Sequence, residues 1–416
     1  MEYGCIGEKL GHSFSKEIHN ALTDYEYTLK ELKKEELSEF FKKKDFKAIN
    51  VTIPYKQDVI EYLDWISDEA KSINAVNTIV NKDGKLYGYN TDFYGLKALI
   101  ERENVSLEGK KVVVLGSGGT SNTAFAVANF LEAHSVFKVS RNEKDGYITY
   151  EELYEKYSDC EIIINTTPCG MYPKTGVSAV ELNKLPKVEA VFDAVYNPLK
   201  PKLVLDAETK NITAVGGLYM LVSQAAYAVE KFIDEPVDNM KVEEVFENLY
   251  KQKINIALIG MPASGKTSVG KVVSKKLNKT FIDSDDEIIK TEKRDIPEIF
   301  IESGEDYFRY VEKSVIKELS MLNSQVISTG GGTILNSENI ENLKANSRIY
   351  FLDRPLDMLK ASSDRPLSSN RADLEKRYRE RYELYKSSAD VIVNGSGTVD
   401  EVAKIIEEDF YEYSCN

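Results

Sequence analysis

Short runs of apolar, often β-branched residues alternate along most of the chain with longer segments in which apolar residues recur every three or four positions. The short runs are typical of strands that are buried on both faces, and the longer segments are typical of amphipathic helices. Their alternation predicts α/β architecture with parallel sheets. No internal repeat or low-complexity segment interrupts the pattern.

Polar residues follow these predicted strands repeatedly. Strands are predicted to begin at Ala48, Lys110, Ser135, Ile162, Ala190, Ile254, Phe281 and Val326. Asparagine, threonine and aspartate stand at strand ends, for example Asn77, Thr91 and Asp92. Open α/β sheets bind their ligands at the ends of their strands, so we expect binding sites there.

The length of 416 residues is enough for two or three domains, and a hydrophobic content of 42% is ample for their cores. The clearest boundary lies between residues 236 and 253. The charged segment 241–247 within it predicts a helix that leads into the strand beginning at Ile254.

Composition narrows the class of partner. The net charge of −14 argues against nucleic acid and against acidic membranes, but local arginines can still bind an anionic small molecule. The four cysteines are scattered and the three histidines are spread out, which fits a reducing cytoplasm and argues against disulfides and zinc. We expect no signal peptide and no membrane span. The oligomeric state stays open.

The segment Gly-Met-Pro-Ala-Ser-Gly-Lys-Thr, from Gly260 to Thr267, fits the phosphate-loop pattern. An apolar strand precedes it and an amphipathic helix, predicted over residues 268–277, follows it. Unpaired N–H groups at such a helix start can bind phosphate. Lys266 would reach the β- and γ-phosphates and Thr267 would hold Mg²⁺, so the chain is expected to bind a nucleoside triphosphate. The alternative is a chance glycine turn. The predicted nucleotide contacts are Gly260, Ala263, Ser264, Gly265, Lys266, Thr267 and Ser268.

Further candidates follow the phosphate loop. Asp283 is placed to help hold Mg²⁺ and Asp285 to grip a substrate hydroxyl and accept a proton, although both acids could instead cap the next helix. Arg309 stands one helical turn before Glu312, which is also the spacing of an ordinary surface ion pair. Residues 330–332 are three glycines that let backbone approach a ligand. Arg365, in the polar loop 362–370, suits a lid over a transferring phosphate. Arg381 lies on a charged helix, where solvent exposure is the simpler interpretation.

Residues 254–410 resemble shikimate kinase, because these motifs occur in that family's order. The resemblance implies that Asp285, Arg309, Gly331 and Arg381 bind shikimate, with both arginines on its carboxylate. It implies that Lys266 and Arg365 stabilise the moving phosphoryl group. The run 359–364 departs from the family, since it looks short and contains no second arginine.

The first half carries its own candidates. Ser13 and Ser15 can present two hydroxyls from a turn, or cap a helix. Lys56 follows a strand end, where a solvated lysine is the simpler interpretation. Gln224 lies in an apolar helix and needs a partner, either a ligand or a backbone carbonyl. A Gly-x-Gly-Gly turn follows the strand at residues 110–115, with a helix predicted over 122–131.

This turn indicates a dinucleotide site. The third glycine of the usual fingerprint would fall at Ser121 and is missing. Arg141 follows the next strand, where an NAD site would place an acid, and it suits the 2′-phosphate of NADP. A surface arginine is the alternative.

Residues 1 to about 235 resemble shikimate dehydrogenase. The resemblance implies that Lys56 and Asp92 form the catalytic pair. It assigns the substrate to Ser13, Ser15, Asn50, Thr52, Asn77, Tyr196 and Gln224, with the two serines on the carboxylate. It assigns NADP(H) to Gly116, Ser117, Gly118, Gly119, Thr120, Arg141 and Gly217. Three departures are Lys16 after the second serine, Ser140-Arg141-Asn142 in place of Asn-Arg-Thr, and Tyr219 in place of a glycine.

The two resemblances name consecutive reactions, which predicts one bifunctional enzyme that uses NADP(H), ATP and Mg²⁺. The predicted domains are an α/β substrate domain (1–95, completed by helices in 217–235), a Rossmann-like NADP domain (96–216), a linker helix (236–252) and a phosphate-loop kinase domain with a parallel sheet (253–416). Two alternatives stay open. One half could be a binding or scaffold module, or quinate or another small hydroxy acid could replace shikimate.

Overall fold

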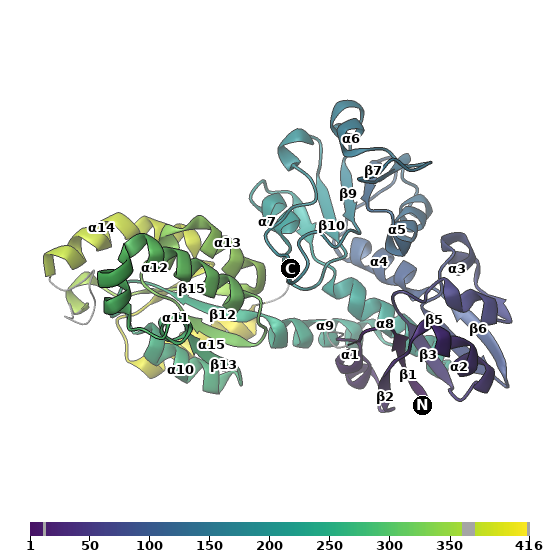
Figure 1. Ribbon diagram of the computed structural model, residues 1–416, viewed down its shortest axis with the longest axis horizontal. Helices are drawn as coiled ribbons and strands as arrows, with labels where there is room; N and C mark the ends of the chain where they lie inside the picture. The colour runs from purple at the N-terminus through teal and green to yellow at the C-terminus, as the bar shows by residue number, and fades with distance from the viewer. Residues whose placement is uncertain (11–13, 360–370, 414–416) are drawn as a thin grey trace. The chain divides into compact units, whose positions relative to one another are not determined.

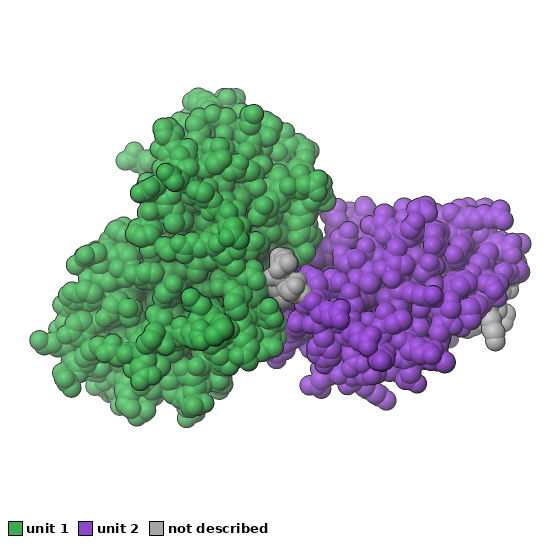
Figure 2. Space-filling model, turned by 180° about the vertical axis from the view of Figure 1, so that it is seen from behind, with its two compact units in different colours: residues 1–249 green, residues 250–416 purple. Residues whose placement is uncertain are grey.

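The computed structural model describes residues 1–10, 14–359 and 371–413 (Figure 1). The chain forms two compact units, Met1–Leu249 and Tyr250–Asn416, coloured separately in Figure 2. The division falls inside one helix, α9 (Asn239–Lys253). No helix of the described ranges is both long enough and apolar enough to cross a membrane.

The first sheet of unit 1 has the strand order β2-β1-β3-β5-β6-β4. The strands are β1 (Tyr3–Gly7), β2 (Tyr27–Glu31), β3 (Ala48–Val51), β4 (Trp65–Ile66), β5 (Thr78–Lys82) and β6 (Lys85–Tyr89). β5 runs antiparallel to both of its neighbours, so this sheet is mixed, an exception that the alternation of strands and helices did not reveal. The reason is local. Asp83 and Gly84 both have positive φ and form a two-residue turn, which can only join antiparallel strands.

Five α-helices accompany this sheet. They are α1 (Ser15–Leu22), α2 (Leu37–Lys43), α3 (Asp68–Ile73), α4 (Thr91–Arg102) and α8 (Leu218–Ile233). α4 and α8 pack closely, because a Cβ atom on Gly95 of α4 would stand only 2.6 Å from the backbone oxygen of Met220. This close contact brings the start of α4 and the middle of α8 to the same edge of the sheet, where the candidate site lies.

The second sheet of unit 1 is wholly parallel, with the order β11-β10-β9-β7-β8. Its strands are β7 (Lys111–Leu115), β8 (Ser135–Val139), β9 (Ile162–Asn165), β10 (Ala190–Asp193) and β11 (Thr213–Val215). Helices α5 (Gly119–Phe130), α6 (Tyr150–Lys156) and α7 (Lys202–Glu208) accompany them. Val112 and Val114 join one apolar core and Val113 and Leu115 join another, so β7 is buried on both faces as predicted. α5 begins at Gly119, three residues before the predicted start.

Unit 2 has one parallel sheet with the order β13-β14-β12-β15-β16. Its strands are β12 (Asn255–Ile259), β13 (Thr280–Asp283), β14 (Gln325–Ser328), β15 (Ser347–Asp353) and β16 (Val391–Asn394). Its helices are α10 (Lys266–Lys276), α11 (Ser284–Glu292), α12 (Ile296–Ser320), α13 (Ser337–Asn346), α14 (Arg371–Ser388) and α15 (Val399–Glu412). The backbone of α12 is broken at Gly304, where φ is 83°. Figure 1 shows helices on both faces of this sheet.

The first part of α9 packs within unit 1 through an aromatic and cationic cluster. The rings of Tyr219 and Phe246 meet edge to face at 5.1 Å between centroids. The guanidinium of Arg102 lies 4.9 Å from the first ring and 4.8 Å from the second, and its Nε donates to Glu243 at 3.3 Å. Tyr219, which stands where the resemblance expects a glycine, therefore serves the packing of α9.

Candidate active sites

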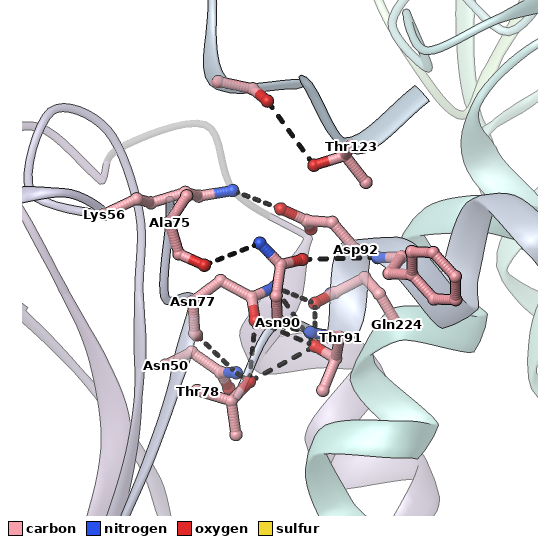
Figure 3. A network of polar contacts seen from close by, with 12 residues as sticks. Asn50, Lys56, Ala75, Asn77, Thr78, Asn90, Thr91, Asp92, Thr123 and Gln224 are labelled. Atoms are coloured by element: carbon pink, nitrogen blue, oxygen red, sulfur yellow. Dashed lines mark hydrogen bonds and ion pairs between the residues drawn. The ribbon is translucent and has the colours of Figure 1, made fainter. Parts of the chain in front are cut away.

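Lys56 and Asp92 form an ion pair at the edge of the first sheet. Lys56 lies five residues beyond the end of β3, and Asp92 is in the first turn of α4. The Lys56 Nζ donates to Asp92 Oδ2 at 2.6 Å, and the two side chains are 23% and 14% exposed (Figure 3). The alternative of a solvated surface lysine does not hold, because Lys56 is mostly buried and paired.

Asn77 lies at the centre of a polar network beside this pair (Figure 3). It comes directly before β5, and because β5 is antiparallel, its start lies at the same edge as the ends of β3 and β6. The Asn77 Nδ2 donates to Thr91 Oγ1 at 3.1 Å, and its Oδ1 accepts from the Thr91 backbone N–H at 2.7 Å. Asn90 caps α4 by accepting from the backbone N–H of Phe93. The network therefore fixes the helix that carries Asp92.

Asn50 and Gln224 extend this network on two sides. The Asn50 Oδ1 accepts from the hydroxyl of Tyr27 at 2.7 Å, and its Nδ2 donates to the Asn77 carbonyl at 3.2 Å. The Gln224 Oε1 accepts from Thr91 Oγ1 at 3.3 Å, while its Nε2 donates to the Leu221 carbonyl of its own helix at 3.0 Å. A backbone carbonyl is thus one partner of Gln224, and the network is the other.

The remaining predicted substrate residues of unit 1 lie in loops or at a helix start. Ser15 is the first residue of α1 and Phe14 is the N-cap, so Ser15 is not the capping residue. The ring of Phe14 lies 5.5 Å from that of Tyr196, whose pKa is raised by burial. Thr52 directly follows β3, and its backbone N–H donates to the Ile6 carbonyl at 3.0 Å. Ser13 lies outside the described residues.

The glycine turn of the second sheet connects β7 to α5. Gly116 has φ of +117°, and a Cβ there would lie 2.6 Å from Thr166 Oγ1. At Gly118 and Gly119 a Cβ would meet nothing within 4 Å, so the loop faces open space. Ser121 is buried, and its Oγ donates to the Gly118 carbonyl at 2.7 Å. The serine therefore stabilises the turn at the position where the fingerprint has its third glycine.

Other predicted cofactor residues surround this turn. Ser117 lies in it, and its carbonyl accepts from the Lys144 Nζ at 3.4 Å. Thr120 is the second residue of α5. Arg141 is exposed two residues beyond β8. Gly217 precedes α8, and a Cβ there would lie 2.4 Å from the Ala194 carbonyl oxygen, so only glycine fits.

Sequence reasoning missed a buried polar pair at the ends of β9 and β10. Asp193 accepts from Asn165 Nδ2 and from the Val195 backbone N–H, both at 2.9 Å. Burial raises the pKa of Asp193 to about 7. The Asn165 Oδ1 in turn accepts from Thr167 Oγ1 at 2.7 Å. The pair therefore organises the loops that face the glycine turn, and a polar residue at each strand end was the only available signal.

The phosphate loop of unit 2 has the conformation that its glycines predict. Gly260 and Gly265 have φ of 150° and 97°, and Ala263 has 65°. Ser264 lies inside the loop and Ser268 in the first turn of α10. The Lys266 Nζ donates to the carbonyls of Gly260 and Met261 at 2.9 and 3.0 Å, so the lysine is held over the loop.

Thr267, Asp283 and Asp285 meet at the end of β13. The Thr267 Oγ1 donates to Asp283 Oδ2 at 2.8 Å. The Asp283 Oδ1 accepts from the Asp285 backbone N–H at 3.1 Å, so Asp283 caps α11 and also faces the phosphate loop. Burial, with smaller contributions from Asp283 and Glu312, raises the pKa of Asp285 to about 6. Asp283 therefore does cap the next helix, and its role in holding Mg²⁺ stays a prediction.

The residues predicted to bind the phosphate acceptor line the same cleft as the phosphate loop. This cleft has a volume of about 520 Å³. Arg309 donates to Glu312 at 2.7 Å and to Glu305 at 3.0 Å. Glu312 is only 1% exposed, which excludes an ordinary surface ion pair. The Arg381 Nη1 donates to the Gly331 carbonyl at 2.9 Å, and Arg381 is only 7% exposed. The simpler interpretation of Arg381 as a solvent-exposed residue is therefore wrong.

Two polar residues of this cleft, Glu312 and Arg377, are not among the site residues predicted from the sequence. Glu312 accepts from Thr333 Oγ1 at 2.9 Å and buries a carboxylate beside Asp285. Arg377 also lines the cleft, although helical spacing alone does not separate it from other arginines of α14. Arg365, and most of the run 359–364, lie outside the described residues.

The residues at both sites have the chemistry that the expected cofactors need. Within the described ranges no three His, Cys, Asp or Glu residues gather as a metal cluster. Mg²⁺ in nucleotide sites needs only one or two protein oxygens besides phosphate, and Thr267 and Asp283 supply these. The open space at Gly118 and Gly119 fits a pyrophosphate approaching backbone.

A shikimate dehydrogenase (NADP(+)) of Clostridium perfringens (strain 13 / Type A) is 41% identical over 264 residues, which is 59% of this chain and 97% of the relative. The chain belongs to the shikimate dehydrogenase family. The model of the family's substrate-binding domain matches residues 5–79.

Solved structures of shikimate dehydrogenases agree with this assignment. A chorismate mutase/shikimate 5-dehydrogenase fusion protein from Clostridium acetobutylicum is 37% identical, with a TM-score of 0.57, over 59% of this chain and 96% of that one. A shikimate 5-dehydrogenase from Thermus thermophilus, in complex with NADP(H) and shikimate, is 25% identical, with a TM-score of 0.54, over 59% and 98%.

Beyond the shikimate dehydrogenase region, the shikimate kinase model matches residues 262–410. This range contains the end of the phosphate loop, Asp283, Asp285, Arg309, the three glycines and Arg381. The two family matches fall in different compact units, Met1–Leu249 and Tyr250–Asn416.

Proposed function

We propose that this chain catalyses two reactions: the NADPH-dependent reduction of 3-dehydroshikimate to shikimate, and the ATP-dependent phosphorylation of shikimate to shikimate 3-phosphate. One observation carries the proposal. Lys56 and Asp92 form an ion pair beside a polar network in the unit that contains the shikimate dehydrogenase match, and the phosphate loop shares a cleft with Arg309 and Arg381 in the unit that contains the shikimate kinase match.

In the reduction, residues of the chain donate the proton that the ketone oxygen takes up. Reduced nicotinamide supplies the hydride when it is bound, and negative charge develops on the ketone oxygen. The Lys56 Nζ donates a proton to that oxygen and stabilises its charge, and Asp92, 2.6 Å from Lys56, orients the amine and shares its proton. Gly116, Ser117, Gly118, Gly119, Thr120, Arg141 and Gly217 would hold the dinucleotide.

The polar network beside this pair suits the ring of the substrate. Thr52, Asn77 and Gln224 would bind its oxygens, with Asn50 and Tyr196 completing the pocket and Ser13 and Ser15 on the carboxylate. The amide groups of Asn77 and Gln224 are fixed by Thr91 before any ligand arrives. Such preorganisation lowers the entropy cost of binding.

In the phosphorylation, Thr267 and Asp283 would hold Mg²⁺, which neutralises phosphate charge when it is bound. Asp285 accepts the proton of the attacking hydroxyl, and its raised pKa of about 6 makes it a better base than an ordinary aspartate. Lys266 and Arg365 stabilise the transferred phosphoryl group, while Arg309 and Arg381 bind the acceptor's carboxylate and Gly331 lines the floor.

Two single substitutions separate the activities. Lys56→Ala should abolish the oxidation of NADPH by 3-dehydroshikimate and leave the phosphorylation of shikimate unchanged. Lys266→Ala should do the opposite, because the lysines lie in different units. Loss of both activities in either variant would contradict independent sites. A chain with only one activity before substitution would show that the other unit is a binding module.

A further inference from the structure

The kinase cleft contains a guanidinium, that of Arg377, which has no partner among the residues that the structure describes. Arg309 is held by Glu305 and Glu312 at 3.0 and 2.7 Å, and Arg381 donates to the Gly331 carbonyl at 2.9 Å. Arg377 lines the same cleft and forms no hydrogen bond or ion pair within the described ranges. Its charge is therefore available to an anion that enters the cleft.

The position of Arg377 is set by α14. Arg377 and Arg381 are four residues apart, so they lie on the same face of this helix, one turn from each other. Arg381 is almost fully buried, and its contact with Gly331 fixes that face against the floor of the cleft. Arg377 thus stands beside the two arginines that the proposed function assigns to the acceptor's carboxylate.

The surroundings of Arg377 do not favour its charge in the absence of a ligand. Burial and the neighbouring Arg381 lower the pKa of Arg377, and these effects outweigh the attraction of Asp373, Glu305 and Glu380. A carboxylate entering between the two guanidiniums would remove this repulsion. Planar guanidiniums also match the two oxygens of a carboxylate in geometry.

We propose that Arg377 binds the carboxylate of the acceptor, as a third guanidinium beside Arg309 and Arg381. The inference rests on the proposed phosphorylation of shikimate. Arg309 is already paired with two glutamates, so Arg377 adds a positive charge that no carboxylate of the described residues pairs with. Acceptors without a carboxylate should therefore gain nothing from Arg377.

The test compares two substitutions on two acceptors. Arg377→Leu removes the charge, and Arg379→Leu is the matched control because Arg379 is exposed on the same helix. Both variants and the unchanged chain are assayed at saturating MgATP with shikimate and with its primary carboxamide. Circular dichroism and the dehydrogenase activity confirm that each variant is folded.

We expect Arg377→Leu to lower kcat/KM for shikimate by about tenfold or more, mainly through KM, because a charge-assisted hydrogen bond is lost. For the carboxamide the change should be less than about twofold, and Arg379→Leu should alter neither. An unchanged kcat/KM for shikimate would overturn the inference, and so would an equal loss on both acceptors, which would place Arg377 on the phosphoryl group. A chain that phosphorylates neither acceptor before substitution would overturn the proposed function, and the inference with it.

Discussion

Asp285 is expected to lower the folding stability of unit 2, to which it belongs. Burial, together with the charges of Asp283 and Glu312, raises its pKa from an ordinary 3.8 to about 6. One pKa unit corresponds to about 1.4 kcal/mol, so the ionised form costs unit 2 at most about 3 kcal/mol of stability. Asp285 is only partly buried, and water in the cleft screens some of this cost, which leaves about 2 kcal/mol.

Asp285→Asn should therefore abolish phosphorylation and, near pH 8, raise the free energy of unfolding of unit 2 by about 2 kcal/mol. The sign follows from proton binding. The folded chain has the higher pKa at this site, so it takes up the proton first as the pH falls, and the unchanged chain regains stability below about pH 6. The advantage of the variant should vanish near pH 4, where Asp285 is protonated when folded.

Urea unfolding measures this difference. Trp65, the single tryptophan, lies in unit 1, so a transition seen by circular dichroism and absent from its fluorescence belongs to unit 2. A gain of about 2 kcal/mol moves the midpoint by about 1 M urea. Asp286→Asn, a change at the exposed neighbour, is the control and should shift stability by less than about 0.5 kcal/mol. A midpoint for Asp285→Asn that is unchanged near pH 8, or a gain that persists near pH 4, would refute the reasoning.

Two further substitutions test the packing. Gly95→Ala places a Cβ 2.6 Å from the Met220 backbone oxygen, so unit 1 should lose about 1–3 kcal/mol, seen as an earlier transition in Trp65 fluorescence; an unchanged transition would contradict this. Lys279→Met removes the buried amine that donates to the carbonyls of Lys251 and Ile254, each 2.8 Å away, and should change how the urea midpoint of unit 2 depends on pH. Burial lowers the pKa of Lys279 to about 8, so the unchanged chain should gain stability above that pH, since it releases a proton that the unfolded chain keeps, and the variant should lack this gain.

The local parts of the fold could be predicted from the sequence. The phosphate loop is specified by residues within one strand, one turn and one helix start, and the structure shows that conformation. The buried strand before the Gly-x-Gly-Gly turn is likewise specified by its own apolar run. The direction of strand β5 was harder to predict than the position of the strands. The two-residue turn at Asp83 and Gly84 carried the signal for the antiparallel β5, and the general alternation of strands and helices concealed it.

The environment of the site residues could not be predicted, because it depends on contacts between distant segments. Glu312 and Arg381 have the sequence surroundings of surface residues, and both are buried by the packing of α12 and α14 around the glycines at 330–332. Tyr219 likewise packs against Phe246, which lies 27 residues further along the chain on α9. The hydrophobic and polar pattern around each of these residues predicts neither the burial nor the aromatic contact.

The central claim is that one chain performs both steps. The most direct measurement incubates the whole chain with 3-dehydroshikimate, NADPH and MgATP and identifies the products by mass spectrometry. We predict shikimate 3-phosphate, formed with an equal loss of NADPH. Shikimate that accumulates without phosphate would contradict the kinase assignment, and a mixture that consumes no NADPH would contradict the dehydrogenase assignment.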